Sequence, residues 1–127
     1  MNQRLMHIAL VVADYDEAID WYTKKLGFKL IEDTLLSEVK RWVLVQPPRE
    51  GSCQLLLAKA ATEEQKSRVG NQTGGRVFLF LHTDDFDRDF ENLRQQGIKI
   101  VRGPSVEEYG KVLVFEDLYG NLWDLIG

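Results

Sequence analysis

The chain has 127 residues, of which 44% are hydrophobic and 28% are charged, and its formal net charge is −4 at pH 7. This balance is typical of one globular domain; the acidic excess argues against a nucleic-acid partner, and no apolar run approaches the roughly 20 residues of a membrane-spanning helix. The N-terminus lacks the pattern of a signal peptide and the single cysteine, Cys53, can form no internal disulfide, so we expect a cytoplasmic protein that binds neither nucleic acid nor membrane.

The first half of the chain predicts the order β-α-β-β-β. An apolar run at 6–12 predicts a strand, and apolar residues at helical spacing predict an amphipathic helix that Asp14 caps at its start and Gly27 ends. Three further strands are expected at 28–31, 41–45 and 54–57.

The second half repeats this order at an offset of 70 positions. It predicts a strand at 77–82, a helix between Asp84 and Gly97, and strands at 98–101, 111–115 and 122–126. The pairs at this offset include His7 with Val77, Gly27 with Gly97, and Gln54 with Asp124. We therefore predict an α+β fold in which residues 1–127 form a single domain of two tandem βαβββ modules, at about 1–60 and 75–127, with a linker at 61–74.

Two strings at the ends of the repeat resemble motifs of one family. The first is His7-Ile8-Ala9-Leu10-Val11-Val12, followed by Asp14, Ala18-Ile19, Trp21-Tyr22 and Leu26-Gly27-Phe28; the second runs from Phe115 to Leu125 and contains Asp117 and Gly120-Asn121. Together they resemble the vicinal oxygen chelate superfamily, which includes glyoxalase I, bleomycin-binding proteins and extradiol dioxygenases. The resemblance covers essentially the whole chain and implies a glyoxalase-like fold, in which the two modules form a curved, half-open barrel, and assembly as a homodimer.

The resemblance also assigns a site. In metal-dependent relatives, the positions of His7, Gln54, Val77 and Asp124 supply imidazole and carboxylate ligands to one divalent ion, which leaves coordination sites open for substrate oxygens. Here His7, Gln54 and Asp124 are the candidate metal ligands, and His7 and Asp124 are the candidate catalytic residues. Gln54 offers a neutral amide in place of a charged ligand and Val77 offers no ligand, so a complete glyoxalase I site is not expected.

Other side chains near these strands have less definite roles. Strict alternation from Val77 places His82 on the opposite face of its strand unless the strand bulges, so His82 is left out of the site. Arg41 and Lys111, which occupy paired positions in the two halves, are expected either to contact a ligand or to be charges at the rim of the site. Trp123 is expected to pack under a helix.

Two functions follow from these residues. One is a metal-assisted lyase, isomerase or transferase that acts on a small oxygenated metabolite through an altered metal site; the identity of its divalent ion is not indicated. The alternative is a binding protein without catalysis that encloses a drug or metabolite, either hydrophobic or, given the net acidity, cationic. In both cases the partner is a small molecule.

Overall fold

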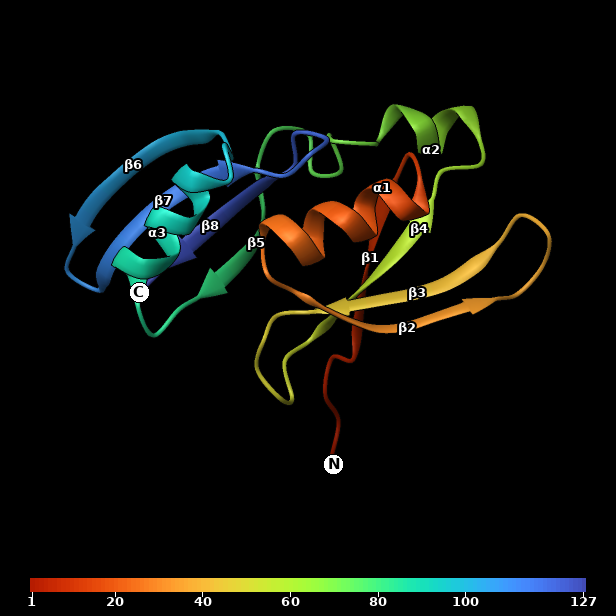
Figure 1. Ribbon diagram of the computed structural model, residues 1–127, viewed down its shortest axis with the longest axis horizontal. Helices are drawn as coiled ribbons and strands as arrows, with labels where there is room; N and C mark the ends of the chain where they lie inside the picture. Colours follow the sequence, from red (N-terminus) through yellow and green to blue (C-terminus); the bar gives the residue numbers. More distant parts are fainter. The chain divides into compact units, whose positions relative to one another are not determined.

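The computed structural model describes all 127 residues, and the chain divides into two compact units, residues 1–69 and 70–127 (Figure 1). Each unit contains one four-stranded mixed sheet. The predicted α+β class and the two βαβββ repeats are confirmed. None of the helices is long and apolar enough to cross a membrane.

The first unit contains one four-stranded sheet, a helical segment between its first two strands, and a short second helix at its end. Its sheet has the order β1-β4-β3-β2, in which β1 is parallel to β4 and the other neighbours are antiparallel. Its elements are β1 (His7–Val12), α1 (Tyr15–Asp20), the π-helical turn η1 (Trp21–Lys25), β2 (Lys29–Leu35), β3 (Arg41–Gln46), β4 (Gln54–Lys59) and α2 (Glu63–Ser67).

The helical segment of the first unit begins and ends as its sequence predicts. The Asp14 side chain accepts a hydrogen bond from the Glu17 backbone N–H in the first helical turn. At the other end Gly27 adopts a positive φ of 79°, a conformation that costs glycine little. Ala18 and Tyr22 are fully buried, so this face of the segment forms the core with the strands beneath it.

The second unit repeats the arrangement with the sheet order β5-β8-β7-β6. Its helix is capped by Asp85, which accepts a hydrogen bond from the Arg88 backbone N–H, one residue beyond the Asp84 of the sequence repeat. Trp123 is buried, as expected, and stacks on Phe115 with ring centroids 6.0 Å apart. The elements are β5 (Val77–His82), α3 (Phe86–Gln95), β6 (Ile100–Glu107), β7 (Gly110–Glu116) and β8 (Leu122–Ile126).

The turn between β7 and β8 is held by a buried carboxylate. Asp117 Oδ1 accepts hydrogen bonds from the backbone N–H groups of Tyr119, Gly120 and Asn121 at 2.9 to 3.0 Å, and its Oδ2 accepts one from Asn121 Nδ2 at 3.0 Å. A Cβ atom at Gly70 would lie 1.8 Å from the Tyr119 carbonyl oxygen, so only glycine fits against this turn. The closing motif that carries the family resemblance therefore shapes a turn.

Candidate functional site

One face of the first sheet is turned away from its helix, and His7 lies on it. Residues on β1 and β4 pair in parallel register, so His7 is beside Gln54 and Val11 is beside Ala58. The alternate residues of the same strands, including Leu10 and Leu57, are fully buried on the helix side. The structure thus brings together two of the three predicted metal ligands, His7 and Gln54, on this open face.

The neighbours of His7 and Gln54 are an aromatic ring and a second amide. The His7 ring meets the Trp42 ring edge-on, with centroids 5.9 Å apart and an interplanar angle of 84°. Gln54 Nε2 donates to Gln46 Oε1 at 3.0 Å. The amide of Gln54 is therefore oriented by Gln46 and is joined to no carboxylate.

Next to this face, β3 and β4 separate. Their register contains only two pairs, Leu44 with Leu56 and Val45 with Leu55, and beyond these the strands diverge (Figure 1). The corresponding strands of the second unit, β7 and β8, stay paired from Val112 to Glu116. The divergence opens a cavity of about 630 Å³ in the first unit, which is lined by Val11, Tyr15, residues 39–42, residues 56–61 and Gln65.

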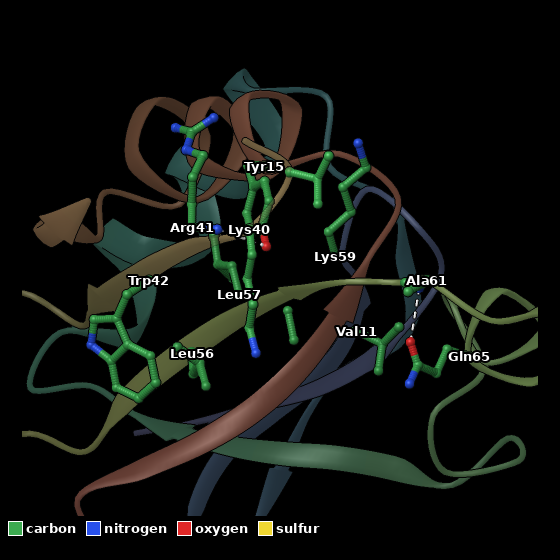
Figure 2. Close-up of a pocket in the computed structure, with 13 residues that line it drawn as sticks. Val11, Tyr15, Lys40, Arg41, Trp42, Leu56, Leu57, Lys59, Ala61 and Gln65 are labelled. Carbon is green, nitrogen blue, oxygen red and sulfur yellow. Dashed lines mark hydrogen bonds between the residues drawn. The ribbon is translucent and has the colours of Figure 1, made fainter. Parts of the chain in front are cut away.

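The lining of this cavity is mainly apolar and includes the aromatic side chains of Tyr15 and Trp42. Trp42 and Leu56 lie toward one side of the view in Figure 2, and Val11 and Gln65 lie toward the other. The Gln65 side chain is fixed because its Oε1 accepts from the Ala61 backbone N–H at 2.8 Å and from the Thr62 backbone N–H at 3.4 Å, the second bond being part of the capping box of α2. A concave apolar surface with few polar groups is the usual character of a site for a small molecule.

Arg41, at the rim of the cavity, is occupied by two carboxylates. Its guanidinium donates to both oxygens of Asp33, at 3.0 and 2.7 Å, and to Asp16 Oδ1 at 2.9 Å, and it lies 5.1 Å from the centroid of the Tyr15 ring. The hydrogen bond from Arg41 holds the pKa of Asp33 below its usual value, and the two carboxylates raise the pKa of Arg41. Lys111 pairs with Asp87 in the same way, at 2.9 Å. Of the two roles expected for Arg41 and Lys111, the structure therefore favours that of paired rim charges.

In the second unit, Asp124 shares a face with His82. The register passes from Val77 opposite Leu122 to Leu79 opposite Trp123, so β5 contains one extra residue. After this bulge Phe80 pairs with Asp124 and His82 pairs with Ile126. The alternation that excluded His82 is broken by the bulge, and no residue in the strand sequence signals it.

The Asp124 carboxylate is short of partners. Its Oδ1 is buried without a hydrogen bond. Burial raises the pKa of Asp124, and electrostatic interactions with Arg102 and then His82 oppose this rise. Arg102, which sequence reasoning missed, lies on the same face of the sheet in β6, two strands from Asp124, because Arg102 pairs with Val114 and Val114 pairs with Asp124.

The residues present do not fit a tightly bound transition metal. The first unit offers His7 and an amide that is already bonded to Gln46, and Val77 in the second unit has no donor atom. Within neither unit do three His, Cys, Asp or Glu side chains gather where they could hold a metal ion. Such ions require several imidazole, thiolate or carboxylate ligands, so we derive no reaction step through a metal.

Comparison with known proteins identifies relatives of this chain. The model of the Glyoxalase/Bleomycin resistance protein/Dioxygenase superfamily matches residues 4–125. An uncharacterized protein of Shewanella frigidimarina is 61% identical over 127 residues, which covers 99% of this chain and 94% of that protein. Two solved structures are similar over nearly their whole length. UcmS2 has a TM-score of 0.86 and 32% identity, covering 99% of this chain and 98% of its own; TnmS3, an antibiotic binding protein from Streptomyces sp. CB03234, has a TM-score of 0.78 and 26% identity, covering 98% and 95%.

Proposed function

Because the chain belongs to the glyoxalase/bleomycin resistance protein/dioxygenase superfamily, as its end motifs predicted, we propose that it is a binding protein for a small, largely apolar molecule that occupies the cavity between β3 and β4. Fold alone does not choose between catalysis and binding in such a superfamily, so the choice depends on the site. The similarity to an antibiotic binding protein supports the same reading.

The observation that carries this proposal is the cavity itself. Its volume of about 630 Å³ suits a molecule of a few fused or linked rings, since small-molecule sites usually measure about 300–1,000 Å³. Trp42 offers a ring face for stacking, and Leu56 and Ala58 offer apolar contact. A ligand that buries on the order of 200 Å² of apolar surface gains about 5 kcal/mol before the entropy of association is subtracted.

Fluorescence titration tests the proposal, because Trp42 is one of three tryptophans in the chain. A panel of two- to four-ring compounds is titrated into wild type, Trp42→Phe, Trp21→Phe as the matched control, and Ala58→Phe, which fills the cavity. We expect a ring compound to quench the fluorescence of wild type and of Trp21→Phe, to quench Trp42→Phe much less, and not to bind Ala58→Phe. Unchanged binding to a folded Ala58→Phe variant would refute the assignment of the ligand to this cavity.

The metal-assisted enzyme is the competing function, and one observation favours it. The buried and unpartnered Oδ1 of Asp124 is the kind of atom that a ligand or cation would satisfy. In this hypothesis His7 and Asp124 act on the substrate, and His7, Gln54 and Asp124 hold a divalent ion. Metal analysis of untagged protein separates the two functions, because stoichiometric metal that is lost in both His7→Ala and Asp124→Ala would replace the binding proposal with the enzyme.

We also propose that the protein is a homodimer, as is common in the superfamily. A mass measured by light scattering on a gel-filtration column tests this proposal directly. A mass of one subunit, 14.7 kDa, at micromolar concentration would contradict it.

A further inference from the structure

The cavity between β3 and β4 has a charge opposite to that of the protein. The chain contains 20 acidic and 16 basic residues, yet the cavity lining includes Lys40, Arg41 and Lys59 and no aspartate or glutamate. We propose, on the basis of the binding function above, that the ligand of this cavity is an anion: an apolar ring system that carries a carboxylate, a sulfonate or an ionised phenol. This is the opposite of the cationic ligand that net charge alone suggests.

The three cations are not equivalent. Arg41 is neutralised by Asp33 and Asp16, with which it forms the ion pairs of the cavity rim. Lys40 and Lys59 form no ion pair, and both are exposed residues that line the cavity. The two ammonium groups are therefore available to a ligand, and Arg41 is not.

The backbone fixes the positions of these two lysines. The Lys40 carbonyl accepts hydrogen bonds from the N–H groups of Leu36 and Ser37 at 2.8 and 3.1 Å, and its own N–H donates to Ser37 Oγ at 3.1 Å, so the hairpin before β3 sets where the side chain starts. Lys59 is the last residue of β4 and pairs with Val12 of β1. Each lysine stem can lie along the apolar lining while its charged end stays in water.

The physical consequence is selection by charge. An anion that enters an apolar cavity loses part of its hydration and requires a compensating cation. Unpaired ammonium groups supply it, and they repel a cationic ligand of the same shape. The second unit lacks this pair of lysines beside a cavity, because Gly110 occupies the position that corresponds to Lys40, and β7 and β8 remain paired.

Two dyes with the same rings form a matched pair of probes. Anilinonaphthalene sulfonate carries one sulfonate, and phenylnaphthylamine has the same ring skeleton without it. Both fluoresce more strongly in apolar surroundings. Their dissociation constants are measured for wild type, Lys40→Met, Lys59→Met, the double variant, Lys99→Met as a control that removes one charge from the second unit, and Ala58→Phe. Melting curves of each variant establish that it is folded.

We expect the sulfonate to bind wild type more tightly than the neutral dye. The dissociation constant of the sulfonate dye should rise by about fivefold in each single lysine variant and by about twentyfold in the double variant, which is the size of effect expected when a partly exposed charge pair is removed. The dissociation constant of the neutral dye should change by less than about twofold in these variants. Lys99→Met should bind both dyes as wild type does, and added salt should weaken the binding of the sulfonate dye alone.

Equal binding of both dyes to wild type, or lysine variants that bind the sulfonate dye as wild type does, overturns the anion proposal and leaves the binding function standing. If neither dye binds, or if Ala58→Phe binds both as wild type does, the binding function itself fails, and with it the anion proposal.

Discussion

Replacing Asp124 by asparagine should stabilise the protein at neutral pH. The Oδ1 atom of Asp124 is buried without a partner, and burial is the main cause that raises the pKa of this carboxyl. The folded protein therefore binds a proton at this group more readily than the unfolded chain does. Stability from this group falls as the pH rises through the interval between the unfolded and the folded pKa, and above that interval the penalty is constant.

The size of the effect follows from the environment of the carboxylate. The substitution leaves a polar atom in the same buried position but removes its charge, so the gain is the cost of burying the charge less the attraction from Arg102, and we expect about 1 kcal/mol for Asp124→Asn. This corresponds to about 3 °C in melting temperature.

Urea unfolding of wild type and Asp124→Asn at pH 7.5, and again near pH 4, measures the gain in the free energy of unfolding and its pH dependence. Asp33→Asn is the matched control of opposite sign. The hydrogen bond from Arg41 lowers the pKa of Asp33, so its contribution is present at neutral pH and is lost as the pH falls through the folded pKa. We expect Asp33→Asn to destabilise at pH 7.5 and nearly as much near pH 4, because pH 4 still lies above the lowered pKa of Asp33. A loss of stability in Asp124→Asn at pH 7.5, or a gain that does not shrink near pH 4, would refute the reasoning.

Two further predictions concern the turn and the metal. Asp117→Ala removes the acceptor of three backbone N–H groups and of the Asn121 side chain, so the free energy of unfolding should fall by about 3 kcal/mol in urea titrations; a loss under about 1 kcal/mol would contradict a structural role for this motif. Zinc, manganese or magnesium should not raise the melting temperature of the metal-free protein, because no site with a sufficient donor set stabilises the native state; a rise that His7→Ala abolishes would contradict the binding function and favour the enzyme.

The features that depend only on residues close together in the sequence could be predicted from it. Asp14 caps the first helix and Gly27 adopts the positive φ that follows it, because both effects depend on a few adjacent residues. The shared face of His7 and Gln54 follows from strand alternation once the two strands are paired. The repeat at an offset of 70 positions identified corresponding strands in the two units.

The remaining features depend on pairing between distant residues. The segment Arg102-Gly103-Pro104-Ser105 has the composition of a turn, yet β6 runs through it to Glu107, because an edge strand tolerates proline and glycine where its register with β7 shifts. The bulge that brings His82 to the face of Asp124 has no mark in the sequence. The sequence predicts a strand at 54–57, and nothing in it indicates that β3 leaves β4 there and opens the cavity.

The unequal pairing in the two sheets has a consequence for how such a protein can change over evolution. Every residue that lines the cavity belongs to the first unit, and most of them come from two short segments, 39–42 and 56–61. The second unit, with β7 and β8 fully paired, contributes none of them. Under the binding function proposed above, substitutions in the two segments would alter which molecule binds without disturbing the core of the second unit. Grafting both segments from one relative into another should transfer ligand preference between them, in the manner of exchangeable loops on a constant scaffold.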